Sequence, residues 1–367
     1  MKMQKGNDKI STYQVGVLIY LTILGVGILT LPASMAKEVE NDGWILSIIA
    51  GLICIGIVYI MCKVGEKFPQ NGFVGTLKLL FGNILGTILA IPTFLYFLLF
   101  AALEVRIFGE TAKIFLLNRT PLEQIMLPLI VLSVILARLG IEPIVRFFEA
   151  VTPVIVFVLF ILFLIGLNGA DFSNLKPFLS HDILSFAKGV KSALFAYAGF
   201  EALLIIFPFI KEPNKAFKAS LGAIVFLIIA YVITIIECYS IFGAQLTTKL
   251  MYPTMSMIKA SDIPGAFIER VEGILEALWV LFVYTSIVSL LYSLSVIAKD
   301  VLGHSEAKHI LVIFLPFIYL ASLIGDSIMD MMKYGDLLTT TVGLYTIFIL
   351  PLVMYILSRF KKVGGSR

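Results

Sequence analysis

The sequence is poor in charged residues and in residues that bind metals or form disulfides. Charged side chains make up 14% of its 367 residues, whereas an ordinary soluble domain contains about 25%. Its three cysteines lie in apolar stretches without a CxxC pair, which excludes a disulfide scaffold and leaves a zinc site without support. No P-loop, HExxH or GxSxG pattern occurs, so the sequence predicts neither an enzyme nor a cofactor. The 28 basic residues exceed the 24 acidic ones too little to indicate nucleic-acid binding.

Long apolar stretches dominate the chain instead. Hydrophobic residues make up 59% of it, and about 20 consecutive apolar residues suffice to cross a bilayer. Windows of that length predict ten transmembrane helices, at residues 12–36, 44–65, 83–110, 122–140, 144–167, 184–209, 218–242, 271–297, 308–325 and 336–358. We therefore predict an all-α integral membrane protein that forms a single transmembrane domain over residues 1–367.

An even number of helices places both termini on one side of the membrane. Most of the basic residues in the predicted connections fall on the side of the N-terminus. Because cytoplasmic loops carry an excess of lysine and arginine, both termini are predicted to be cytoplasmic.

The two halves of the chain carry similar interruptions in their first helix. Small residues stand in mid-span with a proline downstream: Gly25, Gly27 and Pro32 in the first half, Ala198, Gly199 and Pro208 in the second. Transporters built from inverted repeats have interrupted helices at matching positions, and an odd number of helices per half inverts the second half. The sequence thus predicts a five-plus-five inverted repeat, with residues 12–167 and 184–358 as its halves and with helices 1 and 6 broken.

Broken helices in a membrane indicate a binding site, because unwound backbone is tolerated only where it lines a cavity or is buried in protein. Freed amides attract a carboxylate and freed carbonyls hold a cation, which suits a zwitterionic small molecule. The alternative is that the glycines only let helices pack closely. Helix 8 adds a strip of hydroxyls that suits ligand binding and interhelical hydrogen bonding equally well. The expected ligand-binding residues are Gly25, Gly27, Tyr96, Ala198, Gly199, Glu201, Thr285 and Ser289.

Three carboxylates inside predicted spans are candidates for a proton or polar pathway, because a charge at mid-membrane costs about 2.5–3.5 kcal/mol on insertion scales. Glu201 follows the break in helix 6 and suits either an amine or proton contact or a structural hydrogen bond. Glu104 and Arg106 are two residues apart and therefore cannot face each other on a helix, whereas Arg106 and Glu110, four apart, are expected to form a structural pair. Glu237 lies in the outer third of helix 7, where a structural role is also open.

Several segments together match the pattern of a known family. They are residues 10–14 (ISTYQ), 24–32 (LGVGILTLP), 42–44 (DGW), 252–253 (YP) and 269–279 (ERVEGILEALW). These segments resemble the B subunit of nutrient germinant receptors from endospore-forming bacteria, a branch of the amino acid, polyamine and organocation transporter superfamily.

The resemblance implies a leucine-transporter-type fold and a subunit of the spore inner membrane that binds a free nutrient, commonly an amino acid. It further implies an A subunit and a lipoprotein C subunit as partners, and a pocket formed by Gly25, Gly27, Ala198, Gly199 and Thr285. We predict a nutrient sensor that binds its ligand between helices 1, 3, 6 and 8 and signals to these partners. The alternatives are a proton-coupled amino-acid symporter with Glu201 or Glu104 as the proton carrier, and a ligand-gated ion or water conduit.

Overall fold

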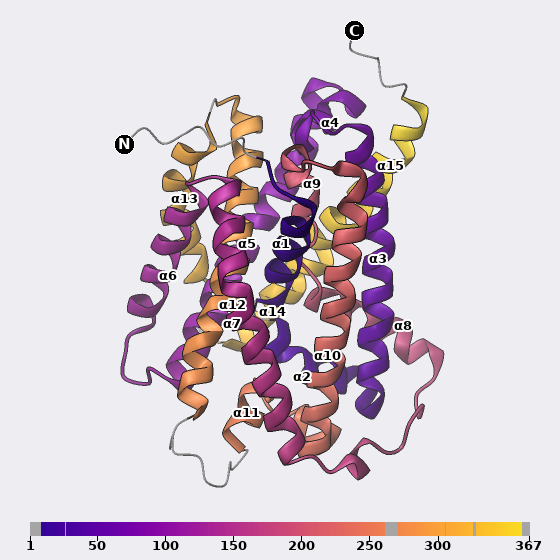
Figure 1. Ribbon diagram of the computed structural model, residues 1–367, viewed down its shortest axis with the longest axis vertical. Coiled ribbons are helices and arrows are strands. Elements are labelled where there is room, and N and C mark those ends of the chain that lie inside the picture. Colours follow the sequence, from indigo (N-terminus) through magenta and orange to yellow (C-terminus); the bar gives the residue numbers. More distant parts are fainter. Residues whose placement is uncertain (1–8, 26, 261–270, 305, 326–327, 362–367) are drawn as a thin grey trace.

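The computed structural model describes residues 9–25, 27–260, 271–304, 306–325 and 328–361. Within these ranges the regular structure is helical, apart from one isolated parallel bridge between Ile10 and Ile210. The helices run mostly along the long axis of the molecule (Figure 1). The predicted all-α architecture is therefore confirmed.

The first half of the chain forms seven α-helices. They are α1 (Thr12–Leu24), α2 (Gly27–Val39), α3 (Gly43–Lys67), α4 (Gly72–Phe81), α5 (Asn83–Phe115), α6 (Leu122–Ala137) and α7 (Ile141–Asn168). Helices α1 and α2 are the two parts of the broken first span, and α4 is a short helix between the second and third spans.

The second half follows a similar order. It comprises α8 (Ile183–Ala196), α9 (Ala202–Ile206) with a 3-10 turn (Phe207–Phe209), α10 (Ala216–Thr247), α11 (Pro253–Ala260), α12 (Val271–Leu302), α13 (Ala307–Ser322), α14 (Ile328–Leu338) and α15 (Leu350–Phe360). Two π-helical turns, Thr339–Gly343 and Tyr345–Ile349, join α14 to α15. The short helices α4 and α11 occupy matching places in the two halves, which suits an inverted repeat, although the boundaries 12–167 and 184–358 stay a prediction.

Six stretches of the described chain are long and apolar enough to cross a membrane by themselves. The other spans are the broken sixth helix and the shorter apolar helices α6 and α13, while α1 completes the first span. The third span is longer than predicted: α5 has 33 residues, or about 50 Å at 1.5 Å per residue, against a hydrocarbon core of about 30 Å.

Two local features explain how the first span begins and bends. Ser11 and Gln14 form a capping box, in which each side chain bonds the backbone amide of the other residue, so α1 begins at Thr12. Pro32 lies inside α2 and has no amide hydrogen for the carbonyl of Ile28. The hydroxyl of Thr254 on α11 donates to that carbonyl at 2.8 Å, which replaces the missing helical bond.

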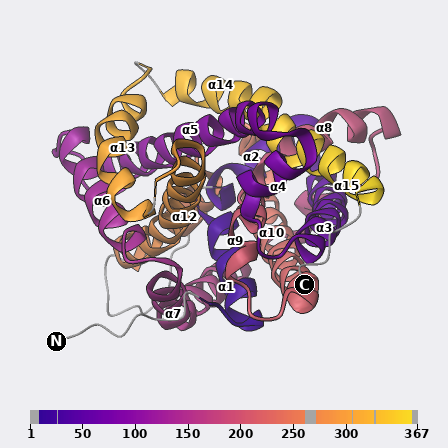
Figure 2. The ribbon, with the colours of Figure 1, turned by 90° about the horizontal axis from the view of Figure 1, so that it is seen from above.

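The core surrounds the broken first helix and α12. In the apolar part of α12, 83% of the residues are buried, compared with 22% in α7. Helix α12 contacts α1, α5 and α9 and lies well inside the bundle in the end-on view (Figure 2). The beginning of α1 and the end of α15 lie toward the same end of the molecule (Figure 1). The interior of the bundle is therefore formed by α1, α5, the sixth span and α12.

Candidate functional site

The breaks in the first and sixth spans lie directly against each other. Gly199 has a φ of +122°, and a Cβ at this position would lie 2.9 Å from the carbonyl oxygen of Thr22. In the other direction, a Cβ at Gly27 would lie 3.1 Å from the carbonyl oxygen of Ala196. Since glycine alone adopts such a φ freely and lets two backbones come this close, these glycines hold the two breaks together.

Gly25 brings the first break against the third and eighth spans. It caps α1 with a non-helical ψ of −113°. A Cβ at this position would lie 2.6 Å from Oε1 of Glu104 on α5 and 2.9 Å from Cβ of Ser286 on α12. The Glu104 carboxyl group therefore lies on the unwound backbone itself.

Hydroxyl groups satisfy the carbonyl groups that the breaks release. Ser286 on α12 donates to the Thr22 carbonyl at 2.7 Å. The Tyr231 hydroxyl on α10 lies 2.9 Å from the carbonyl oxygen of Ala196 and 3.3 Å from that of Ile23, so it connects both broken helices. Because no water is available inside a bilayer, such bonds are what allows the helices to be interrupted.

The Glu201 carboxylate connects the sixth span to the third. Its Oε1 accepts a hydrogen bond from the Tyr96 hydroxyl at 2.8 Å, and its Oε2 accepts one from the amide of Gly199 at 2.8 Å. Both side chains are fully buried. In this conformation the amide of Gly199 is therefore bonded within the protein.

The structure brings most of the predicted site residues into one cluster. Around the two breaks lie Gly25, Gly27, Tyr96, Glu104, Ala198, Gly199, Glu201 and Thr285. Thr285 immediately precedes Ser286 on α12, and its hydroxyl lies 3.5 Å from the carbonyl oxygen of Leu21. The Ser289 hydroxyl donates back to the carbonyl of Thr285 one turn further along α12. That these residues bind a ligand stays a prediction.

Glu237 does not join this cluster. It lies six residues after Tyr231 on α10, which is about 9 Å of helix rise. Its carboxyl group packs on α7, where a Cβ at Gly166 would lie 2.4 Å from Cδ of Glu237. Its side chain is 4% exposed, and Oε1 has no hydrogen-bond partner among the described residues. A shared proton pathway with Glu201 and Glu104 therefore has no geometric support.

Two residues that hold the breaks together were not among the predicted site residues. Ser286 belongs to the hydroxyl-rich stretch of helix 8, in which the predicted ligand-binding residues are its neighbours Thr285 and Ser289. Tyr231 is a lone tyrosine in the apolar run FLIIAYVITII of residues 226–236. A buried tyrosine usually bonds its hydroxyl to a partner, which is the signal that identifies it.

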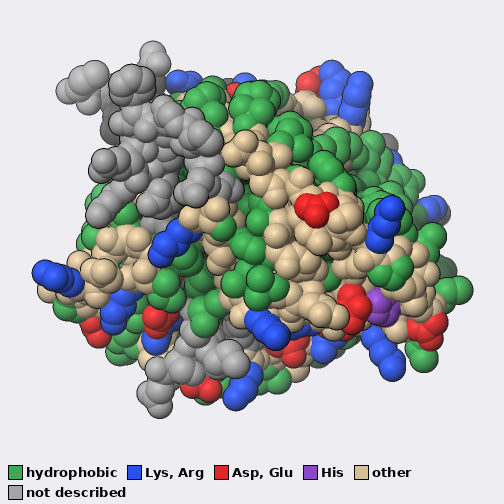
Figure 3. Space-filling view, turned by 90° about the horizontal axis from the view of Figure 1, so that it is seen from below, with side chains coloured by type: hydrophobic (Ala, Val, Ile, Leu, Met, Phe, Trp, Pro, Cys, Tyr) green, Lys and Arg blue, Asp and Glu red, His purple; other side chains and the backbone are tan. Residues whose placement is uncertain are grey.

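A polar vestibule lies beside the cluster at the end of the molecule opposite the start of α1. It measures about 190 Å³ between α2, α5, α8 and α14, and its charged residues are Lys37, Glu38, Lys191 and Asp336. Figure 3 shows that this end carries charges of both signs among hydrophobic side chains. Phe195 lines the vestibule, its ring lies 6.0 Å from that of Phe100, and the Phe100 ring lies 5.5 Å from that of Tyr96. Aromatic rings thus separate the vestibule from the Tyr96–Glu201 pair.

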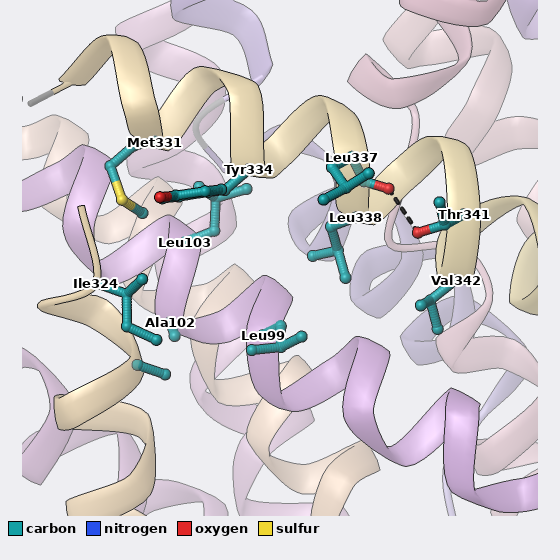
Figure 4. Close-up of a pocket in the computed structure, with 11 residues that line it drawn as sticks. Leu99, Ala102, Leu103, Ile324, Met331, Tyr334, Leu337, Leu338, Thr341 and Val342 are labelled. Atoms are coloured by element: carbon teal, nitrogen blue, oxygen red, sulfur yellow. Dashed lines mark hydrogen bonds between the residues drawn. The ribbon is translucent and has the colours of Figure 1, made fainter.

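A second cavity adjoins the vestibule, and none of the described residues that line it is charged. It has a volume of about 330 Å³, and α5, the end of α13 and the last span enclose it (Figure 4). Leu103 and Met331 line both this cavity and the vestibule. Among the described residues that line it, Tyr334 and Thr341 supply the only polar side chains, so this lining does not suit the charged groups of a zwitterion.

The chain is similar to spore germination proteins along nearly its whole length. The profile of the family described as Spore germination protein matches residues 9–331. Spore germination protein A2 of Bacillus subtilis (strain 168) is 29% identical over 356 residues, covering 96% of each chain. Spore germination protein YndE of the same strain is 27% identical and covers 97% of this chain and 98% of its own. Spore germination protein GerLB of Bacillus cereus is 27% identical and covers 98% and 97%.

Among solved structures, the fold is similar to that of Mhp1, a nucleobase-cation-symport-1 family transporter, in a closed conformation with bromovinylhydantoin bound. The TM-score is 0.67 at 13% identity, over 96% of this chain and 82% of Mhp1. A likeness at this identity concerns the fold alone, and it confirms the predicted leucine-transporter-type architecture with its broken first and sixth helices. Neither the family nor the fold is an enzyme class. The chain belongs to the family of spore germination proteins, and it is an integral membrane protein with a transporter fold.

Proposed function

We propose that this chain is the nutrient-sensing membrane subunit of a spore germination receptor. It lies in the spore inner membrane with both termini in the cytoplasm and binds a free amino acid at mid-membrane. The conformational change that binding causes is transmitted to an A subunit and a lipoprotein C subunit. Membership of the spore germination protein family supports the germination role. The geometry around the two breaks supports a binding site within a transporter fold.

The observation that carries the proposal is the position of Glu201 between the two breaks and α5. Its carboxylate is the acceptor for Tyr96 and for Gly199, so an incoming ammonium group competes for the same oxygen atoms. The carboxylate of an amino acid suits the beginning of α2 at Gly27, where helix amides and the helix dipole favour negative charge. One amino acid can therefore contact both broken helices, with its ammonium group at Glu201 and its carboxylate at Gly27.

Ligand binding at this position changes which helices are held together. The bond between Glu201 and Tyr96 connects the sixth span to α5. In this arrangement the rings of Phe195 and Phe100 separate the cluster from the vestibule. A ligand shifts a conformational equilibrium only through its different affinity for the two states. Transfer of Glu201 from Tyr96 to an ammonium group supplies that difference, and it releases the contact between the sixth span and α5.

A proton-coupled amino-acid symporter is the second candidate, because two buried carboxylates adjoin the breaks. Glu104 lies against Gly25, and Glu201 lies beside Gly199. In a symporter, one of these groups takes up a proton when the substrate binds and releases it on the other side. The fold, which is similar to that of a cation symporter, is compatible with this cycle.

Sealed liposomes that contain the purified protein distinguish the candidates. Binding and uptake of a labelled amino-acid panel are measured with and without an imposed proton gradient. A sensor binds specifically without accumulation, whereas accumulation driven by the gradient establishes the symporter. A nutrient-dependent flux of ions or water without amino-acid uptake indicates a conduit instead.

A matched pair of variants tests the site within the same assay. Glu201→Gln removes the negative charge that the ammonium group requires, so we expect at least a tenfold loss of affinity, or about 1.4 kcal/mol. Glu123→Gln makes the same change on an exposed residue of α6 and serves as the control. Unchanged binding in Glu201→Gln removes Glu201 from the ligand site.

A further inference from the structure

A crevice with a volume of about 680 Å³ opens between α1, α7 and α10, away from the candidate ligand site. These three helices contact one another and lie side by side in the end-on view (Figure 2). Gly16 on α1 and Gly222 on α10 both line it. A Cβ at Gly222 would have no atom within 4 Å, so the crevice is open beside this residue.

The crevice has the depth of one leaflet of the bilayer. Along α10 its lining extends from Lys215 to Phe226, which is 11 residues or about 16 Å of helix rise. The hydrocarbon core is about 30 Å thick, and one leaflet is half of that. At the inner end, the Tyr20 ring packs edge-on against Phe226, and its hydroxyl lies 2.5 Å from that of Thr152. The inner end is therefore closed near mid-membrane.

The rim of the crevice is basic. Lys215 and Lys218 line it at the end where α1 begins and are both exposed. Lys215 pairs with Glu212 at 2.6 Å, and Glu212 also accepts a hydrogen bond from Thr12. Lys218 has no ion-pair partner within the part of the chain that the structure describes. Among the described residues, one positive charge at the mouth of the apolar crevice is therefore left without an ion pair.

We propose that this crevice binds one anionic phospholipid of the leaflet on the side of the N-terminus, with its phosphate at Lys218 and Lys215 and an acyl chain along Gly222 toward Phe226. Basic pockets between transmembrane helices on the cytoplasmic side are known to take anionic headgroups. An acyl chain matches the length, position and apolar interior of the crevice, and the phosphate matches its rim. The predicted orientation places this leaflet on the cytoplasmic side.

The bound lipid lies against α1, which the break at Gly25 separates from α2, the other part of the first span. Helix α1 forms one wall of the crevice and ends at the break at Gly25. A lipid between α1 and α10 therefore stabilises the position of α1 relative to α7 and α10. This inference does not depend on the proposed function, because lipid binding is measured without a nutrient.

The test is lipid binding to the purified full-length protein in detergent. After delipidation, dioleoyl phosphatidylglycerol and dioleoyl phosphatidylcholine are titrated separately, and bound lipid is counted by native mass spectrometry. We expect the anionic lipid to bind at least about fivefold more tightly, since each lysine near an anionic surface contributes about 1 kcal/mol. Inorganic phosphate at the same concentrations should not compete, because it lacks the acyl chain. Equal binding of the two lipids, or full competition by phosphate, contradicts the proposal.

Two kinds of variant separate the rim from the interior. Lys215→Gln with Lys218→Gln should reduce phosphatidylglycerol binding to the level of phosphatidylcholine, whereas Lys249→Gln at the opposite end of α10 should change nothing. Gly222→Leu fills the crevice and should reduce binding of both lipids, while Gly56→Leu puts the same side chain at an equally open position of α3. Thermal unfolding confirms that each variant is folded. If both Gly222→Leu and the lysine variant bind lipid as the wild type does, the proposed lipid site is wrong. If Gly222→Leu does not fold, the lysine variant and the comparison of the two lipids test the proposal.

Discussion

The hydroxyl of Tyr96 on α5 donates a 2.8 Å hydrogen bond to Oε1 of Glu201 beside the break in the sixth span, and both side chains are fully buried. This bond joins two transmembrane spans at the depth of the helix breaks. It uses a carboxylate oxygen that a ligand ammonium group also requires. The closed arrangement and ligand binding are therefore alternatives for the same atoms.

Tyr96→Phe should destabilise the closed protein, because it leaves Oε1 of Glu201 buried without this donor. We expect a loss of about 1–2 kcal/mol in the free energy of unfolding, seen as a lower midpoint of thermal unfolding in detergent. Amino-acid binding should become tighter, since the ligand no longer competes with Tyr96. Tyr334→Phe, on a half-exposed residue of α14, is the control. Weaker amino-acid binding in a folded Tyr96→Phe protein means that the hydroxyl contacts the ligand directly.

Gly199→Ala should lower both the stability and the nutrient response strongly, although it adds only one methyl group. The φ of +122° is unfavourable for alanine, and the new Cβ would lie 2.9 Å from the Thr22 carbonyl oxygen. A residue forced into such a conformation costs about 1–3 kcal/mol, and separating the two breaks adds to this. Thermal unfolding and nutrient response should both be impaired. Gly56→Ala, at an open helical position, should behave as wild type, and an equally mild Gly199→Ala would show that the two breaks do not need their close contact.

The spans and the breaks were predictable from the sequence because both leave local signals. Apolar runs of membrane length identify the helices, and glycines with a downstream proline identify the interruptions. Gly25, Gly27 and Gly199 were expected at the breaks. A Cβ at Gly25 or Gly199 would collide with a neighbouring helix, and a Cβ at Gly27 would be tightly packed against one.

The partners of the buried polar groups were not predictable, because they depend on how helices far apart in the sequence pack. Glu201 bonds Tyr96 across 105 residues, and Tyr231 bonds the Ile23 carbonyl across 208. Glu237 has the same residue type and a similar apolar neighbourhood in the sequence, yet the rotation of α10 directs it to Gly166 of α7. Residue type and depth identify candidates, whereas the choice among them needs the fold.

Thr254 and Pro32 should show energetic coupling. The Thr254 hydroxyl donates at 2.8 Å to the Ile28 carbonyl, which Pro32 leaves without a helical amide. Thr254→Val should lower the stability by about 1 kcal/mol. In a Pro32→Ala background the amide of residue 32 can bond the Ile28 carbonyl again, so the same substitution should cost less. A double-mutant cycle on thermal unfolding measures the difference, and strictly additive effects would show that Thr254 acts through packing alone.

Glu237→Gln should separate this carboxyl group from ligand recognition. Its Oε1 has no hydrogen-bond partner among the described residues, and the group packs on Gly166, away from the breaks. The substitution keeps the shape of the side chain and removes a buried ionisable group, whose charged form is costly inside a membrane. We therefore expect equal or higher thermal stability and an unchanged nutrient response, in contrast to Glu201→Gln. The comparison is made on both variants in the same liposome assay across the same pH range. A loss of response in Glu237→Gln at normal protein levels would place a proton or polar pathway between α7 and α10, where the position of Gly166 gives no reason to expect one.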